Sequence, residues 1–178
     1  MTNVIIVRGG GDLGSGVSLR LHRTGMRVII TELPQPLVVR RLVSFAEAIY
    51  RGEAWVEEVR AQRIEDVNQI AAAFSAGAIP VMVDPPCRIL ETLHQAHPGL
   101  IPAVLVDARM MKRPPELERS AAPMVVGLGP GFIAGVNCHA VVETNRGFYL
   151  GRVIWDGAAS ADTGVPEGFG GAYLDRVL

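Results

Sequence analysis

Three glycines near the start of the chain, Gly9, Gly11 and Gly14, have the spacing G-x-G-x-x-G. They follow an apolar, β-branched run at 4–7, which reads as a buried strand, and they open a segment with helical periodicity. In such a turn the first glycine permits the sharp bend, the second lets a pyrophosphate approach the backbone, and the third lets the helix pack against the sheet. Free amides at the start of the helix attract that anion. The spacing therefore predicts a nucleotide or dinucleotide site.

An acidic residue stands where this kind of turn needs a ribose partner. Glu32 follows a second apolar run at 28–31, about where an acid that accepts from ribose hydroxyls is expected. Because a carboxylate opposes a 2′-phosphate, we expect NAD rather than NADP. The alternative is a tight turn that binds nothing and leaves Glu32 in solvent. The cofactor-binding residues predicted around this turn are Gly9, Gly10, Gly11, Asp12, Leu13, Gly14 and Glu32.

Asp12 is the unusual member of this set, because a carboxylate inside a phosphate-binding turn repels the anion. We expect its side chain to cap the helix by accepting from backbone amides. Arg8, just upstream, is expected to offset its charge.

Later strands also end in residues that suit a ligand. Asp84 and Asp107 close apolar runs in "VDPP" and "VDAR", and Gly129 and Gly131 flank Pro130 in "GLGPGF". Ligands of open α/β sheets collect at the carboxyl ends of strands, so these four residues join the predicted cofactor-binding set. Helix capping by the aspartates and a purely structural corner at Pro130 are the alternatives.

The densest polar chemistry lies in "NCHAVVETNRG". On a strand, His139 and Glu143 share one face. They are the predicted catalytic pair, with His139 as proton donor in the same cleft as Gly11 and Glu143 orienting it. Two ligands on one strand do not make a metal site, so no metal is predicted. Cys138, on the opposite face, reads as a small buried hydrophobe.

The elements that must position these residues alternate between strand and helix. Strands are predicted at 4–7, 28–31, 79–83, 103–106 and 124–128, and helices after the glycine turn to Gly25 and at 37–50, 65–76 and 89–96. The segment 54–59 reads as a strand or a loop. Strand–helix–strand repetition predicts a Rossmann-like, doubly wound α/β fold with a mostly parallel sheet.

The pattern changes after Phe132. Two strand-like runs joined by a hairpin turn at 145–147 predict a C-terminal β-hairpin or irregular appendage. We therefore expect a nucleotide-binding domain at 1–132 and a β-rich appendage at 133–178, with the chain stopping before a further region.

Bulk properties exclude several classes of protein. The 178 residues are 49% hydrophobic and 20% charged, and the net charge of -1 argues against a general grip on nucleic acid or an anionic membrane. Two distant cysteines make no disulfide framework. Without a secretory signal or a long apolar run, the chain is expected to be cytoplasmic. A homo-oligomer is expected.

Several motifs together carry a resemblance to a known family. "VRGGGDLGSGVSLRLHRTG", "TELPQPLVVRRLVSFAEAIYRG", "VDARMMKR", "GLGPGFIAGVNCHAVVETNRG" and "GRVIWDGAASADTGVP" resemble the YqeB-type accessory proteins of the selenium-dependent molybdenum hydroxylase system. Proteins of this type are usually longer and are associated, like XdhC-type factors, with maturation of molybdenum hydroxylases. The resemblance implies a pathway more firmly than a reaction.

The function expected from the residues and the resemblance together is a dinucleotide-binding maturation factor. Its cofactor is NAD or another dinucleotide, including the molybdopterin dinucleotide, and its partner is a molybdenum hydroxylase apoenzyme. Two alternatives stay open: an NAD-dependent oxidoreductase acting on a small molecule, and a non-catalytic regulatory module.

Overall fold

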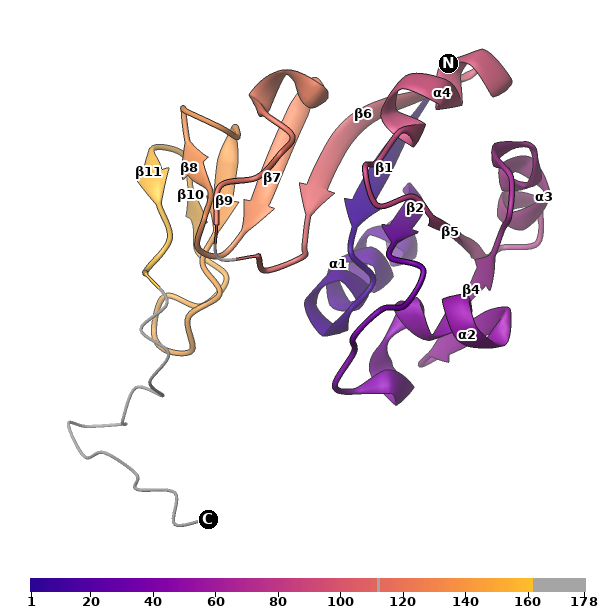
Figure 1. Cartoon of the computed structure of the whole chain (residues 1–178), viewed down its shortest axis with the longest axis horizontal. Helices are drawn as coiled ribbons and strands as arrows, with labels where there is room; N and C mark the ends of the chain where they lie inside the picture. Colours follow the sequence, from indigo (N-terminus) through magenta and orange to yellow (C-terminus); the bar gives the residue numbers. More distant parts are fainter. Residues whose placement is uncertain (112, 162–178) are drawn as a thin grey trace, which may run out of the picture.

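The computed structural model describes residues 1–111 and 113–161. A nine-stranded sheet runs through the molecule in the order β10-β9-β7-β6-β1-β2-β5-β4-β3 (Figure 1). Its strands are β1 (Thr2–Arg8), β2 (Arg27–Glu32), β3 (Glu53–Val56), β4 (Val59–Arg63), β5 (Ile79–Val83), β6 (Leu100–Asp107), β7 (Met124–Leu128), β9 (Ala140–Val142) and β10 (Val153–Ile154). A separate pair is made by β8 (Ile133–Ala134) and β11 (Gly157–Ala158).

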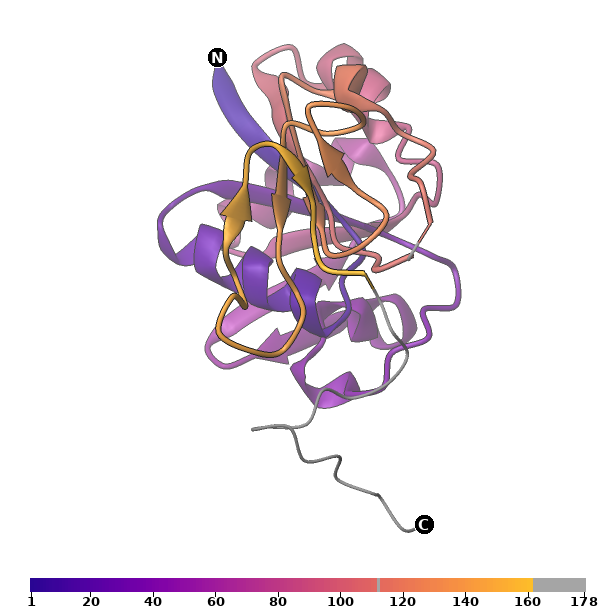
Figure 2. The same ribbon diagram turned by 90° about the vertical axis from the view of Figure 1, so that its left-hand side faces the viewer.

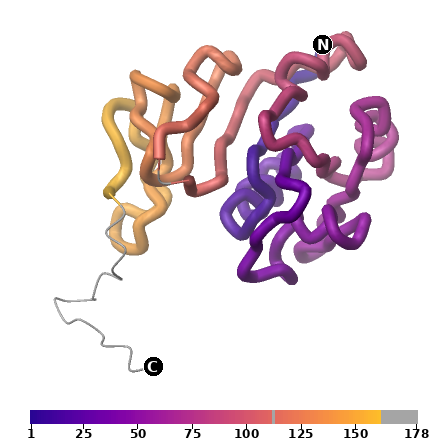
Figure 3. The backbone as a smooth tube through the Cα atoms, in the orientation of Figure 1, coloured from indigo at the N-terminus to yellow at the C-terminus, as the bar shows by residue number. Residues whose placement is uncertain are grey.

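Most of the large sheet is parallel. The pairs β3–β4 and β9–β10 are antiparallel, and the other neighbours within it run in the same direction. Figure 3 follows the chain from β5 through α4 to β6, where it crosses to the other side of β1. Without the β3–β4 hairpin, the parallel strands lie in the order β5-β2-β1-β6-β7-β9. Numbered by their sequence in the chain, these six strands stand in the order 3-2-1-4-5-6. That is the Rossmann order, with its switch point between β1 and β6.

Helices cover both faces of the sheet. They are α1 (Asp12–Arg23), α2 (Ala48–Arg51), α3 (Ile70–Ser75) and α4 (Ile89–Ala96). Along β1, Val4 and Ile6 pack in one core with α3 and α4, while Ile5 and Val7 pack in the other with α1 and α2. The continuous apolar run of β1 is the pattern of a strand buried on both faces. The predicted α/β fold class is confirmed.

The helix predicted over 37–50 is wrong for most of its length. The chain forms short 3₁₀ turns at Arg41–Val43 and Phe45–Glu47, and only Ala48–Arg51 is α-helical. Ser44 between the two turns is extended, with φ -128° and ψ 124°. Its hydroxyl donates to the carbonyl oxygen of Gly10 at 2.7 Å, so contact with the glycine turn overrides the helical periodicity.

Other expected elements differ in extent. The segment 54–59, left open between strand and loop, contains the strand β3, and the helix expected at 65–76 is the 3₁₀ turn Val67–Gln69 followed by α3. Asp66 caps that turn with a capping box, so the helix start was readable from the sequence.

Two strands of the expected C-terminal appendage, β9 and β10, join the main sheet. β9 pairs in parallel with β7, and β10 pairs antiparallel with β9. The expected tight turn at 145–147 is wrong, because the connection runs from 143 to 152, closed by the Glu143 amide on the Arg152 carbonyl at 2.9 Å. Figure 2 shows the β8–β11 pair in front of the sheet's end.

Candidate functional site

A cavity of about 880 Å³ opens at the carboxyl ends of four neighbouring strands, β1, β2, β5 and β6. It lies at the switch point of the sheet, where open α/β folds bind their ligands. The residues that line it are Arg8, Gly9, Gly11, Thr31, Glu32, Leu33, Pro36, Leu37, Val38, Asp84, Pro85, Pro86, Ala108, Arg109, Met111, Arg113, Glu116 and Leu117. The predicted glycine turn, its acidic partner and Asp84 therefore meet in one place.

The glycine turn is shaped by close backbone approaches. Gly9 has φ +98°, which favours glycine, and a Cβ on Gly14 would lie 1.9 Å from the Gly9 carbonyl oxygen. Gly11, by contrast, has no heavy atom within 4 Å of where its Cβ would be. The first and third glycines thus serve the turn and the packing of α1. The middle one leaves bare backbone facing the cavity, as a pyrophosphate requires.

Gly10 is clamped from several sides. Its carbonyl oxygen accepts from the hydroxyls of Ser15 at 2.8 Å and Ser44 at 2.7 Å and from the amide of Ala46 at 2.9 Å. Its own amide donates to Glu32 Oε1 at 2.7 Å. The turn is therefore fixed in shape, with no ligand needed to order it. Ser15 and Ser44 were missed in the sequence: Ser15 stands between Gly14 and Gly16, whereas Ser44 lies far along the chain from the glycines and has no local signal.

Glu32 sits at the end of β2, nearly buried, on the wall of the cavity. Its Oε1 accepts from Gly10 and its Oε2 from the amide of Leu33, also at 2.7 Å. Burial raises the pKa of this carboxyl, against the two hydrogen bonds, which lower it. Each oxygen of a carboxylate has a second lone pair, so Glu32 can still accept from a ligand hydroxyl.

Asp12 does not cap α1, as the sequence analysis expected. The N-cap residue is Gly11, and the structure shows no side-chain cap hydrogen bond there. Asp12 Oδ2 instead pairs with the guanidinium of Arg40, while its buried Oδ1 has no hydrogen-bond partner among the residues that the structure describes. Leu13 lies in the first turn with its side chain half exposed. The amides of Asp12 and Leu13 are among those that a helix start leaves without an intrahelical partner.

The two aspartates at strand ends have different roles. Asp84 Oδ2 accepts from the amide of Ile89 at 2.9 Å, so it caps the start of α4 while lining the cavity. Asp107 is buried and pairs with Arg109, whose Nε and Nη2 lie 2.9 and 2.7 Å from its two oxygens. Arg8 Nη1 lies 3.6 Å from Asp107. The expectation that Arg8 offsets Asp12 is wrong, because Arg8 pairs across to the β6 side.

Gly129 and Gly131 are not among the residues that line the cavity. A Cβ on Gly129 would meet Thr144 Oγ1 at 2.4 Å, and one on Gly131 would meet the Arg113 carbonyl oxygen at 2.4 Å. Both also have positive φ, of +75° and +101°. This loop is thus a packed corner that supports the segment carrying Arg113, which does line the cavity.

His139 and Glu143 are not brought together, and the expected catalytic pair is wrong in its geometry. The Nδ1 of His139 accepts from the amide of Val125, at the amino end of β7, whereas the glycine turn lies at the carboxyl ends. Glu143 follows β9 at its other end, about 13 Å further along an extended chain. His139 precedes β9 and Glu143 follows it, and two residues at opposite ends of a strand cannot act on one proton.

Glu143 has a structural role instead. Its Oε1 accepts from the amides of Thr144 and Asn145, and its Oε2 from the amide and hydroxyl of Ser160, all at 2.7–2.8 Å. Burial pushes the pKa of Glu143 upward, but these hydrogen bonds outweigh it and lower the pKa. The carboxylate ties the end of β9 to the segment after β11.

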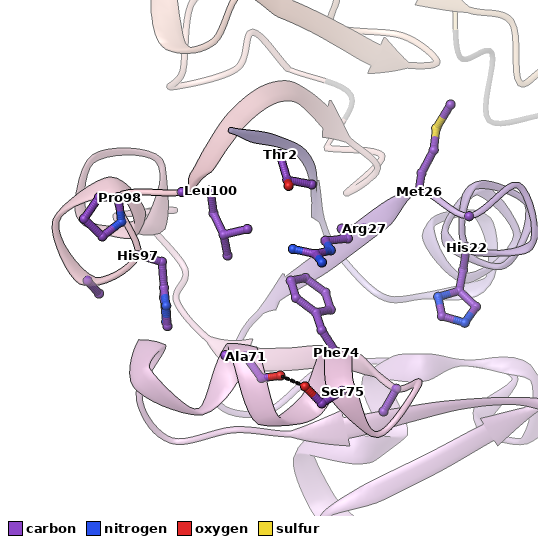
Figure 4. A pocket seen from close by; sticks show the side chains of 14 residues that line it. Thr2, His22, Met26, Arg27, Ala71, Phe74, Ser75, His97, Pro98 and Leu100 are labelled. Carbon is purple, nitrogen blue, oxygen red and sulfur yellow. Dashed lines mark hydrogen bonds between the residues drawn. The ribbon is translucent and has the colours of Figure 1, made fainter.

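A second cavity, of about 820 Å³, lies at the opposite ends of the strands, around the amino ends of β1 and β2 (Figure 4). The guanidinium carbon of Arg27 stands 5.5 Å from the centre of the Phe74 ring. His22 and His97 line opposite sides, and His97 Nε2 is 2.8 Å from the Val67 carbonyl oxygen. None of the predicted site residues lies here.

Both cysteines, Cys87 and Cys138, are buried and unpaired by disulfide. Burial raises the pKa of the Cys87 thiol to about 11, which makes it unreactive as a nucleophile at neutral pH. In the part of the chain that the structure describes, no helix has the length and apolar character to cross a membrane. Across residues 1–111 and 113–161, no cluster of three histidine, cysteine or acidic side chains has a metal-binding arrangement.

Fold and site together define a class of protein: a Rossmann-like α/β chain with a G-x-G-x-x-G turn at its switch point. The chain is 42% identical over 175 residues to the uncharacterized protein YqeB of Escherichia coli K12, an alignment that spans 98% of this chain. It confirms the resemblance to YqeB-type proteins. The chain covers 31% of the length of that relative. No protein-family model matches the chain, and no solved structure matches it.

Proposed function

We propose that this chain binds a dinucleotide of the NAD type in the cavity at the carboxyl ends of β1, β2, β5 and β6. The observation that carries the proposal is the bare backbone of Gly11, which faces this cavity at the start of α1. A tight βα turn without a ligand needs small residues at Gly9 and Gly14, where the backbone packs closely. It does not need a glycine at position 11.

The charges around the turn suit the parts of a dinucleotide separately. The amides at the start of α1 and its partial positive charge favour the pyrophosphate. Glu32 offers its free lone pairs to a ribose diol. A 2′-phosphate would meet the carboxylate of Glu32, and Arg40 is already paired with Asp12. NAD is therefore favoured over NADP.

A binding or carrier role is favoured over a dehydrogenase. Among the described residues that line the cavity there is no histidine. His139 lies near the amino end of β7, whereas the cavity lies at the carboxyl ends of the strands. We propose a role as an accessory factor in molybdenum hydroxylase maturation on the motifs that resemble YqeB-type accessory proteins, since the aligned E. coli relative is itself uncharacterized. In that role the chain holds a dinucleotide, including the pterin dinucleotide itself, for a hydroxylase apoenzyme.

Thermal unfolding against a panel of NAD, NADP, ATP, CTP and molybdopterin dinucleotides tests the proposal. A ligand that binds only the folded chain stabilises it by about 2.7 kcal/mol at a hundred times its Kd. We expect a dinucleotide to raise the Tm, with NAD above NADP. If only the pterin dinucleotide raises the Tm, the carrier role is supported over the NAD-dependent one. If no compound in the panel does, the proposed function is wrong.

A further inference from the structure

Three arginines converge on one carboxylate at the β6 side of the cavity. Glu116 Oε2 lies 3.3 Å from Arg8 Nη1 and 2.7 Å from Arg109 Nη2, and its Oε1 lies 3.5 Å from Arg113 Nη2. All four side chains line the cavity. The arrangement is that of a small anion held by several guanidinium groups, with Glu116 as the anion.

Two of the arginines, Arg8 and Arg109, are built into the structure more firmly than the acid, whereas the Arg113 side chain is exposed. The Arg8 side chain is 6% exposed, and its Nε and Nη2 donate to the Pro85 carbonyl oxygen at 3.2 and 2.6 Å. Arg109 is fixed by its bidentate pair with buried Asp107. Glu116, in contrast, is half exposed and comes from a loop. The three guanidinium groups thus face two carboxylates, of which Asp107 is buried and Glu116 is exposed enough to rotate into solvent.

We propose that Arg8, Arg109 and Arg113 form an oxyanion subsite that Glu116 occupies until a phosphate or carboxylate group of the ligand replaces it. Both kinds of group match the planar fork of arginine. This subsite lies on the far side of the switch point from Glu32, so it receives an anionic group beyond the pyrophosphate at Gly11. The inference rests on the proposed function for the cavity it describes, but its test does not need a dinucleotide.

The backbone of Arg113 packs against the neighbouring loop, while its side chain extends from that backbone with an exposed surface. A Cβ at Gly131 would lie 2.4 Å from the Arg113 carbonyl oxygen, so only glycine allows this approach. The second glycine loop thereby positions the backbone of Arg113 without touching the ligand. Ion pairing with Arg109 lowers the pKa of Glu116 to about 2, so the occupying carboxylate is charged at neutral pH and must be displaced, not protonated.

Calorimetry with inorganic phosphate and with malonate tests the subsite. Removing the competing charge in Glu116→Gln should tighten anion binding at least about tenfold, the effect of one charge-assisted hydrogen bond. The double variant Glu116→Gln/Arg113→Gln should lose most of this gain. Glu118→Gln and Arg119→Gln, exposed residues that do not line the cavity, are the matched controls and should behave as wild type. The anion that Glu116→Gln binds with the higher affinity identifies the ligand group as a phosphate or a carboxylate.

The outcomes separate this inference from the proposed function. If Glu116→Gln binds neither anion more tightly than wild type, or if Glu118→Gln gains as much, there is no subsite. If Glu116→Gln gains but Arg113→Gln does not reverse the gain, the anion binds elsewhere and the assignment is wrong. If the gain is found in a chain that binds no dinucleotide, the subsite stands and the proposed function fails.

Discussion

Gly10 shows how single residues fix the candidate site. Its amide donates to Glu32 and its carbonyl oxygen accepts from Ser15, Ser44 and Ala46, so the turn is tied to β2, to α1 and to the segment after β2. A turn held in this way presents the neighbouring Gly11 in one position. Preorganisation of this kind lowers the entropic cost of binding a ligand.

The charge of Glu32 should matter for binding. We expect Glu32→Gln to weaken NAD binding by about 1–3 kcal/mol, because an amide nitrogen cannot accept from a ribose hydroxyl. Calorimetry on both proteins measures the difference, with Glu91→Gln on the exposed side of α4 as control. Unchanged affinity would mean that no ribose diol lies at Glu32.

Glu32 also predicts a pH dependence. Because burial raises its pKa, the folded chain holds this proton more tightly than the unfolded chain does. Its contribution to stability is therefore present below the ordinary value of 4.5 and is lost as pH rises through the raised pKa. The unfolding free energy of wild type minus that of Glu32→Gln should fall over this range in urea titrations. A constant or rising difference would contradict the raised pKa.

Glu143 should prove structural. In Glu143→Ala, four donors from Thr144, Asn145 and Ser160 lose their acceptor, so the unfolding free energy should fall by about 1–3 kcal/mol. NAD affinity, measured by calorimetry at a temperature where the variant is folded, should stay the same. A selective loss of binding would restore Glu143 to the functional site.

Among the elements, α1 carries two glycines with opposite expected behaviour. A Cβ at position 14 strikes the Gly9 carbonyl oxygen at 1.9 Å, whereas at position 16 it meets nothing within 4 Å. We expect Gly14→Ala to destabilise by about 1–3 kcal/mol through overpacking and Gly16→Ala to stabilise by about 0.5–1 kcal/mol through helix propensity. Chemical denaturation of both variants checks this. Similar effects of the two substitutions would mean that α1 does not pack closely on β1.

The sequence predicted the central elements well, because their signals are local. A short local pattern marks each of three elements that the structure contains: the strand at 4–7, the glycine turn and the helix at 89–96. The helix expected at 37–50 failed because Ser44 and Ala46 bond to Gly10, more than thirty residues earlier in the chain. Such a contact leaves no periodic trace in the sequence.

The residues predicted from the sequence include residues that line the cavity near β1 and β2, but not Arg109 and Glu116, which line it near β6. Glycine spacing and the acid after β2 are a known pattern, so Gly11 and Glu32 could be found. The cluster of Arg8, Arg109 and Glu116 depends on which strands are neighbours, and strand order is not written in spacing. His139 was misplaced for a related reason, because alternation gives the face of a strand but not the end of it that meets the cavity.

At the scale of the whole molecule, the strand order reverses between β1 and β6 beside the cavity, and the order of the strands decides which side chains line it. The homo-oligomer and the hydroxylase apoenzyme stay predictions about partners. The alignment with the E. coli relative covers 31% of that protein, so the activity of such a longer protein is a proposal for this chain.

Calorimetric titration of NAD into wild type and Gly11→Val tests the central claim most directly. Gly11 is extended, with φ -67° and ψ -171°, and has open space at its Cβ position, so valine should be accommodated in the fold. We predict that wild type binds NAD and that Gly11→Val, with an unchanged Tm, shows no measurable binding, because the side chain fills the place of the pyrophosphate. Equal affinity in the two proteins would show that no pyrophosphate lies against Gly11.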